Sequence, residues 1–152
     1  MKRALIVSPF SERKEADIAY AREAMRWCLD TGMAPFVGQL LYGEILDDRV
    51  PSDRTLRLNA DQEYIKDADV VVAFVDRGVS TEMEADVEIA MSHSSRIEIV
   101  TLKSPIGPIR LAYDHRSYAA LGEEIQSLKS GSFCLHSVLP EADYLAHQAA
   151  VN

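Results

Sequence analysis

The residues best suited to chemistry are the acidic side chains of one predicted helix, which begins at Ser80 or Thr81 and follows a buried strand. This helix carries Glu82, Glu84, Asp86 and Glu88. The first two have an ordinary explanation, because acidic residues in a first helical turn complement the helix dipole and face water. Asp86 differs, because it lies one turn further along, at the border of an apolar face that includes Met83 and Val87. A carboxylate in that position can act as a nucleophile or as a base.

Hydroxyl side chains are expected at the same place. They come from the segment after the first strand and from the helix start, at Ser8, Ser11, Ser80 and Thr81. With the free N–H groups of a helix N-terminus they would suit a phosphate or a sugar hydroxyl, although a serine at a helix start often serves only as a cap. Arg54 and Arg57 on the preceding helix could also meet a phosphate, but solvated positions are the simpler interpretation. Neither a Walker sequence nor GxGxxG is present, so NTP hydrolysis and dinucleotide binding are not supported.

Metal ligands and cysteine nucleophiles are not indicated by the sequence. No HExxH or CxxC pattern occurs, and the histidines are far apart, at His93, His115, His136 and His147. Cys28 and Cys134 stand in unrelated contexts, which is typical of free thiols in a reducing cytosol. A GxSxG elbow is also missing. The prediction is therefore a cytoplasmic protein with no metal ion and no other cofactor.

Composition limits the classes of partner. The chain has 152 residues and a net charge of −8, and no cluster of Lys and Arg stands out. Nucleic-acid polymers and anionic membrane surfaces are therefore disfavoured as partners, whereas a single nucleoside or nucleotide needs only a few donors. The start of the chain, residues 1–10, is better interpreted as a strand than as a signal peptide, and no later stretch is suited to span a membrane.

Periodicity predicts an alternating α/β chain. Besides the acidic helix, it predicts strands at residues 3–8, 34–37, 68–76 and 97–102, helices at 12–31, 52–66 and 117–129, and a short strand and helix at 133–135 and 141–149. Residues 39–51 are expected to form a loop with a helical turn, Ser52 to cap the helix after it, and Pro105 and Pro108 to end regular structure. The Val- and Ala-rich run 68–76 is typical of a strand buried on both faces of a parallel sheet. The turn after it opens at the carboxyl end of that strand, where ligands bind in open α/β sheets.

A set of short motifs runs in a defined order through the first two thirds of the chain. The motifs are Ser8-Pro9-Phe10, Pro35-Phe36, Leu41-Tyr42, Leu46-Asp47-Asp48, Arg54, Asp61, Asp69, Asp76-Arg77, Ser80, Met83, Asp86 and Ala90. In order and spacing this set resembles the nucleoside 2-deoxyribosyltransferase-like superfamily, which includes the 2′-deoxynucleoside 5′-phosphate N-hydrolases; the nearest look-alikes are small bacterial and phage members. The resemblance covers about residues 3–102, and residues 103–152 diverge. It implies a single α/β domain over 1–152, a three-layer sandwich with a mostly parallel, Rossmann-like or flavodoxin-like sheet.

The resemblance also implies an activity. In characterised members a Glu four residues before an Ala attacks C1′ of the sugar, and Asp86, followed by Ala90, matches that Glu. Cleavage or transfer at the N-glycosidic bond of a (deoxy)nucleoside or nucleoside 5′-monophosphate would then proceed through a glycosyl-enzyme intermediate. Asp61 matches a family Asp near the sugar and base, which makes it the second catalytic candidate. Candidate substrate-binding residues, from the motifs and the hydroxyl cluster, are Ser8, Phe10, Ser11, Arg54, Asp76, Ser80, Thr81 and Glu82. Members assemble as dimers or larger, so a homo-oligomer is expected.

The chain departs from the family pattern at three positions. Asp86 replaces Glu, which withdraws the carboxylate by roughly 1.5 Å, when about 1 Å of misplacement can already cost 100-fold. Glu82 stands where look-alikes usually have Gly, and Gln39 stands where many have His. Two alternatives therefore stay open beside the enzyme. One is a non-catalytic nucleotide-binding or sensing module of the same fold, and the other is an interaction protein that binds a partner through the residues after Leu102.

Overall fold

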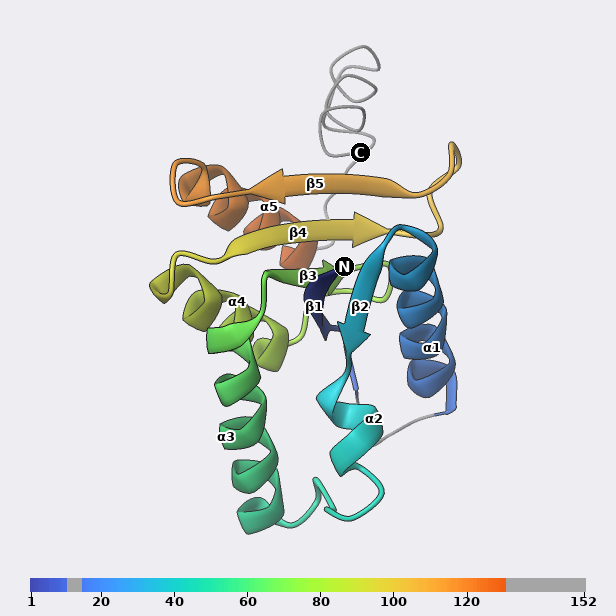
Figure 1. Cartoon of the computed structure of the whole chain (residues 1–152), viewed down its shortest axis with the longest axis vertical. Coiled ribbons are helices and arrows are strands. Elements are labelled where there is room, and N and C mark those ends of the chain that lie inside the picture. The colour runs from blue at the N-terminus through green and yellow to red at the C-terminus, as the bar shows by residue number, and fades with distance from the viewer. Residues whose placement is uncertain (11–14, 131–152) are drawn as a thin grey trace.

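The structure is a computed structural model that describes residues 1–10 and 15–130 of the chain (Figure 1). Within that part the strands form one sheet: β1 Lys2–Val7, β2 Met33–Phe36, β3 Val70–Phe74, β4 Arg96–Thr101 and β5 Ile109–Tyr113. Their order is β2-β1-β3-β4-β5, with β1 to β4 parallel and β5 antiparallel to β4. This is the flavodoxin-like order, in which the strand order reverses between β1 and β3. The α/β fold with a mostly parallel sheet, expected from the sequence, is confirmed.

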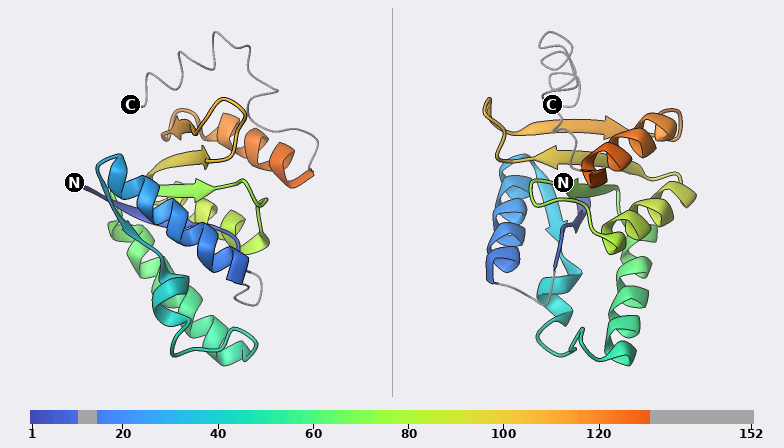
Figure 2. Two further views of the ribbon diagram at one scale, coloured as in Figure 1. Left: turned by 90° about the vertical axis from the view of Figure 1, so that its right-hand side faces the viewer. Right: turned by 180° about the vertical axis from the view of Figure 1, so that it is seen from behind.

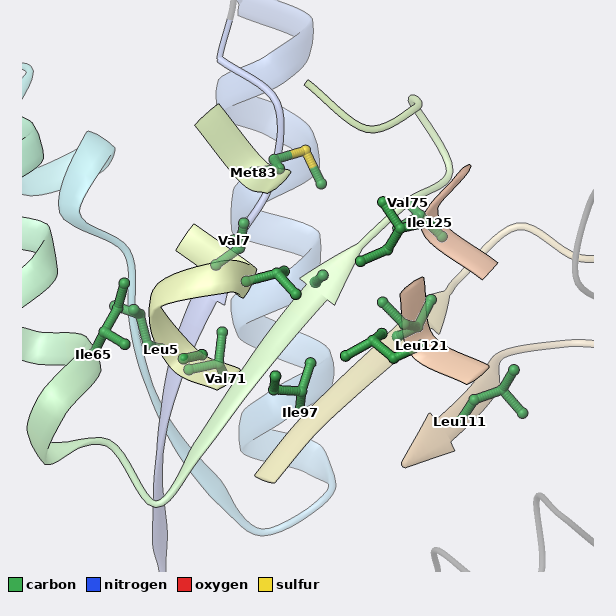
Figure 3. Close-up of a cluster of buried hydrophobic side chains, with 14 of the residues drawn as sticks. Leu5, Val7, Ile65, Val71, Val75, Met83, Ile97, Leu111, Leu121 and Ile125 are labelled. Atoms are coloured by element: carbon green, nitrogen blue, oxygen red, sulfur yellow. The ribbon is translucent and has the colours of Figure 1, made fainter. Parts of the chain in front are cut away.

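Helices cover both faces of the sheet, which gives three layers (Figures 1 and 2). They are α1 Glu15–Asp30, α2 Gly38–Tyr42, α3 Pro51–Asp67, α4 Thr81–Ser92 and α5 Tyr118–Ser130. On one face, α1 buries Tyr20 and Ala24 in a core cluster with residues of β1 and β3. On the other face, α3, α4 and α5 contribute Ile65, Met83 and Leu121 to a second cluster, which Figure 3 shows.

The central strand β3 is packed on both faces. Its five residues, Val70–Phe74, are at most 2% exposed. Val71 and Ala73 belong to the cluster under α3 to α5, whereas the other three belong to the cluster under α1. A strand with no solvated face needs an apolar residue at every position, which explains the unbroken run in the sequence. Burying each valine side chain contributes roughly 1.5–3 kcal/mol to folding, so β3 anchors the elements that carry the site.

Two local expectations were wrong. Pro108 does not end regular structure, because β5 begins directly after it and pairs with β4 along the sheet edge. Ser52 does not cap α3: the cap position is Val50, which makes no side-chain hydrogen bond, and Pro51 occupies the first helical position, where its missing N–H costs nothing. The loop with a helical turn expected at 39–51 is confirmed, and α2 forms that turn. The strand and helix predicted at 133–135 and 141–149 lie outside the described residues.

Membrane-spanning helices were also considered. None of the helices in residues 1–10 and 15–130 has the length and apolar character needed to cross a bilayer.

Candidate functional site

The candidate site lies where the parallel strands end and α4 begins. The chain leaves β3 through a turn in which Gly78 adopts a positive φ of 92°, a conformation that favours glycine. Ser80 then caps α4, since its Oγ accepts a hydrogen bond from the Met83 N–H at 3.2 Å. The cap fixes the start of α4, whose first turn lies near the end of β1. Asp86 follows one turn further along the helix. The serine expected at this helix start is therefore used as a cap.

A small cavity of about 30 Å³ lies beside Asp86. Its apolar wall comes from the end of β1 and from Phe10, and its polar wall comes from α2, α3 and α4. The polar and charged lining residues are Ser8, Gln39, Arg57, Asp61, Glu82 and Asp86. A volume of this size holds about one water molecule. The fold thus brings together both catalytic candidates with three of the candidate binding residues, Ser8, Phe10 and Glu82.

A larger pocket of about 530 Å³ opens next to this cavity. Its lining residues are Pro9, Phe10, Asp48, Arg49, Arg54, Ser80, Thr81 and Glu82. Its volume falls within the range typical of small-molecule sites. Phe10 and Glu82 line both spaces, so they stand at the boundary between the inner cavity and the outer pocket. Ser80, Thr81 and Arg54 therefore line the outer pocket and not the inner cavity beside Asp86.

Arg57 is the centre of the charged network, and the expectation that it is solvated was wrong. Its side chain is 2% exposed. The guanidinium bonds three carboxylates, from Nε to Asp48 at 2.9 Å, from Nη1 to Asp61 at 2.9 Å and from Nη2 to Glu82 at 3.0 Å. Glu82 also forms an ion pair with Arg54. A buried arginine stays charged and needs such partners, so one side chain ties the loop before α3, α3 itself and α4 together.

Asp61 lies one helical turn after Arg57, on the face of α3 that is buried. The residue is 7% exposed, and its Oδ2 accepts the bond from Arg57. Its other oxygen, Oδ1, makes no hydrogen bond. Gly38 packs directly against this oxygen, because a Cβ placed on Gly38 would lie 1.8 Å from Asp61 Oδ1. The first residue of α2 must therefore be glycine for the Asp61 carboxylate to sit where it does.

The pKa values of both carboxyl groups are raised. The pKa of Asp86 is raised from 3.8 to about 7, mainly by burial and also by the charges of Asp61 and Glu82, whereas Arg57 acts against this rise. The pKa of Asp61 is raised from 3.8 to about 6, again mainly by burial, although the charge of Arg57 and its hydrogen bond act against it. Burial and a neighbouring negative charge both disfavour the ionised form of a carboxyl group. Both groups therefore hold their protons to higher pH than an exposed aspartate does, and Asp86 does so more strongly than Asp61.

Two of the candidate binding residues are placed by the described structure in neither the inner cavity nor the outer pocket. Asp76, after β3, accepts the backbone N–H groups of Leu102 and Lys103, each at 2.8 Å, and a bond from the Tyr20 hydroxyl. Its carboxylate thus joins the ends of β3 and β4 to α1, and it lines neither the inner cavity nor the outer pocket. Ser11 lies outside the described residues.

Sequence reasoning considered a phosphate contact for Arg57 and favoured a solvated position, although a signal for its buried ion pair was present. Arg57 and Asp61 are four residues apart on one predicted helix, a spacing that brings opposite charges together. The partners Asp48 and Glu82 come from other elements, so only the fold reveals that four charged groups converge. Within residues 1–10 and 15–130, no group of three or more His, Cys, Asp or Glu side chains is arranged to hold a metal ion.

Comparisons with known proteins agree with the architecture. The family described as "Domain of unknown function (DUF7768)" matches residues 2–100. A 2-deoxyribosyltransferase from Bacillus psychrosaccharolyticus aligns with 67% of this chain and 74% of its own, at 17% identity and a TM-score of 0.54. The CMP N-glycosidase BcmB of Clostridium botulinum aligns with 66% of this chain and 71% of its own, at 16% identity and a TM-score of 0.45. None of the curated protein sequences matches the chain. At these identities the first of the two structures establishes a shared fold.

Proposed function

The chain belongs to the DUF7768 family of domains of unknown function, and we propose that it breaks or exchanges the N-glycosidic bond of a (deoxy)nucleoside or nucleoside 5′-monophosphate. The observation that carries this proposal is the pair of buried carboxyl groups, Asp86 and Asp61, on the wall of one cavity at the switch point of the sheet. Retaining glycosidases use two carboxyl groups, one as the nucleophile and the other as the acid and base. The shared fold with a 2-deoxyribosyltransferase makes this chemistry the first to test.

In the proposed reaction the ionised Asp86 carboxylate attacks C1′ of the sugar. The C1′–N bond breaks and its electron pair goes to the departing base. A base that is neutral in the nucleoside departs as an anion, and it becomes the neutral free base by taking up a proton from the site or from water. The resulting glycosyl ester on Asp86 is then attacked by water, which gives hydrolysis, or by a second base, which gives transfer. Asp61, fixed by Arg57, acts on the sugar and the base as the second carboxyl group.

Substrate access depends on Glu82 in this proposal. The cavity beside Asp86 holds about one water, whereas the outer pocket has the size for a nucleoside. Glu82 stands at the boundary of the two, held there by Arg54 and Arg57. We infer that Glu82 turns toward the outer pocket when the sugar enters. Ser80, Thr81 and Arg54 would then contact the part of the ligand that remains outside.

The direct test is release of free base. The purified protein is incubated with a panel of ribo- and deoxyribonucleosides and their 5′-monophosphates, and the bases are separated by liquid chromatography. The proposal expects release from at least one compound and loss of release in Asp86→Ala. The matched control is Glu88→Ala, which removes an exposed acidic side chain from the same helix. Absence of release from every compound, or equal release by the Asp86→Ala protein, would refute the proposal.

A non-catalytic nucleotide-binding module of the same fold is the second candidate. The arrangement of Glu82 favours it, because Glu82 lines both spaces and its bond from Arg57 at 3.0 Å holds it between them. In such a module the ligand would occupy the outer pocket and leave the inner cavity undisturbed. Titration calorimetry separates the two functions: binding without any base release, unchanged in Asp86→Ala, would select the binding module.

A further inference from the structure

The charges on the inner cavity are unbalanced. Its lining contains the carboxylates of Asp61, Glu82 and Asp86 but one guanidinium, that of Arg57. That guanidinium is already bonded to Asp61 and Glu82, and to Asp48 behind them. An anionic group entering this cavity would have to displace a carboxylate. A cationic group would meet carboxylates whose charge Arg57 compensates only in part.

Two of these carboxylates also lack donors. Asp61 Oδ1 is buried without a hydrogen bond in a residue that is 7% exposed. Asp86 forms no hydrogen bond and no ion pair with the described part of the chain, although it lines the same cavity. A buried polar oxygen without a partner costs roughly 1–3 kcal/mol, and more when it is charged. The carboxyl groups of Asp61 and Asp86 can therefore accept further positive charge or hydrogen-bond donors from a ligand. They line the inner cavity, which lies next to the outer pocket.

A metal ion is not the ligand we expect here, because within the described residues these carboxyl groups are not arranged as a group that could hold one. A flat organic cation fits better, since its charge is spread over a ring and requires no close ligand sphere. Phe10, on the wall shared with the outer pocket, supplies an aromatic face for such a ring. The ligand is therefore expected to carry a positive charge on its base. The portion of the ligand that enters the inner cavity should carry no negative charge.

We propose that the site takes a nucleoside whose base is cationic through alkylation or glycosylation of a ring nitrogen, in preference to a neutral purine or pyrimidine nucleoside. This inference rests on the proposed function and names its substrate class. When the C1′–N bond breaks, its electron pair returns to the positively charged nitrogen, and the base departs as a neutral molecule. No general acid is needed for that departure. Asp61 and Asp86 can both be ionised, one to stabilise the cation and one to attack C1′.

The charge state of the free protein agrees with this assignment. Without a ligand, burial is the main cause that raises the pKa values of Asp86 and Asp61 to about 7 and about 6, and the charge of Asp61 adds to the rise at Asp86. A bound cation favours the ionised form of a neighbouring carboxyl group. Cation binding should therefore expel the proton that the pair holds, and it should generate the nucleophile in the same step. A neutral nucleoside would leave that proton in place.

The test compares ligands that differ mainly in charge. 7-Methylguanosine is set against guanosine, and nicotinamide riboside against its reduced, uncharged form, in slightly acidic buffer. Binding is followed by calorimetry in two buffers of different ionisation enthalpy, which reports proton release, and cleavage by chromatography. We expect the cationic member of each pair to bind at least about tenfold more tightly, because one unit charge near a partly buried carboxylate is worth more than 1.4 kcal/mol. Proton release should accompany only the cation.

Variants and outcomes separate this inference from the proposed function. Asp61→Asn and Asp86→Asn should each reduce the preference for the cation, whereas Glu88→Gln, an exposed change on the same helix, should leave it intact. Cleavage with equal or better binding of the neutral members would overturn the inference and leave the proposed function standing. Tight binding of the cation without cleavage would support the inference and overturn the proposed function. If neither member of either pair binds, both fail. The comparison of ligands on the unmodified protein needs no variant to fold.

Discussion

Replacing Asp86 by asparagine should stabilise the fold, and the gain should grow with pH. The unfolded chain ionises this carboxyl group near pH 3.8, whereas in the folded protein its pKa is raised to about 7 by burial and by the charges of Asp61 and Glu82. Between these two pH values the folded state holds a proton that the unfolded state has released. The free energy of unfolding of the unmodified protein therefore falls as pH rises through this window, and the loss is complete above about pH 7.

The size of the effect follows from the two pKa values. The pKa rises by about 3, and one pKa unit corresponds to about 1.4 kcal/mol, so the upper bound is roughly 4 kcal/mol. Asp86 is partly exposed at the cavity, and solvent screening lowers that figure. We expect Asp86→Asn to raise the free energy of unfolding by about 2–3 kcal/mol at pH 8 relative to its effect at pH 4. Such a gain would agree with the role that we propose for Asp86, because active-site groups are commonly kept at a cost in stability.

Urea unfolding at several pH values from 4 to 8, followed by circular dichroism, measures this difference. Glu88→Gln is the control, since it removes the same formal charge from an exposed position of α4. Asp61 titrates in both proteins, so the comparison isolates Asp86 and its coupling to Asp61. If the Asn variant and the control change stability equally at all pH values, the Asp86 carboxylate is not buried among like charges. The arguments about the cavity would then fail with it.

Three further predictions concern the groups that support the site, and urea unfolding measures each. Arg57→Met leaves buried carboxylates unpaired and should cost about 3–5 kcal/mol at pH 7, with partial recovery at pH 5 as they take up protons; a loss independent of pH would contradict this. Gly38→Ala forces a Cβ against Asp61 and should cost about 1–3 kcal/mol, a cost that Asp61→Ala should relieve; no relief would show that the contact is unimportant. Tyr20→Phe removes the hydroxyl that bonds the carboxylate and the N–H of Asp76 and should cost about 1–3 kcal/mol, whereas no change would mean that water replaces it.

The sequence predicts the framework of this fold well because local pattern decides it. The continuous apolar run at β3 can only be satisfied between two helical layers, and the alternation of strands and helices leaves few topologies. The edge strand β5 escaped prediction, because it follows two prolines and is only half buried. Its residues Ile109 and Leu111 pair with residues of β4. This pairing is a contact between two strands, and the residue pattern of β5 alone does not reveal it. The start of α3 was misplaced for a similar reason, since Pro51 rather than a polar side chain begins it.

The site was predictable in its chemical types but not in its connections. Asp86 was identified by its place beside an apolar face, and the structure puts it on the wall of a cavity. Arg57 was taken as solvated, because a single charged residue on a helix of mixed composition gives no sign of burial. Its partners are separated from it by up to 25 residues along the chain. Asp76 was grouped with the ligand-binding residues, whereas its carboxylate is engaged by two backbone N–H groups at the end of β4. The periodicity of a sequence does not reveal hydrogen bonds and ion pairs between different helices, strands and loops.

Glu82 connects the energetics of the network to the choice of ligand. It bonds both Arg54 and Arg57 and lines both spaces, so we expect a ligand that enters the inner cavity from the outer pocket to displace Glu82 from Arg57. Once that contact breaks, Arg57 still has Asp48 and Asp61, and Glu82 still has Arg54. Displacing Glu82 from Arg57 therefore costs one of the four ion pairs of this network, and it leaves no buried charge without a partner. A cationic base would offset this cost by approaching the carboxylates directly, whereas a neutral base would not. The selectivity that we propose therefore depends on movement of Glu82, which lines both spaces.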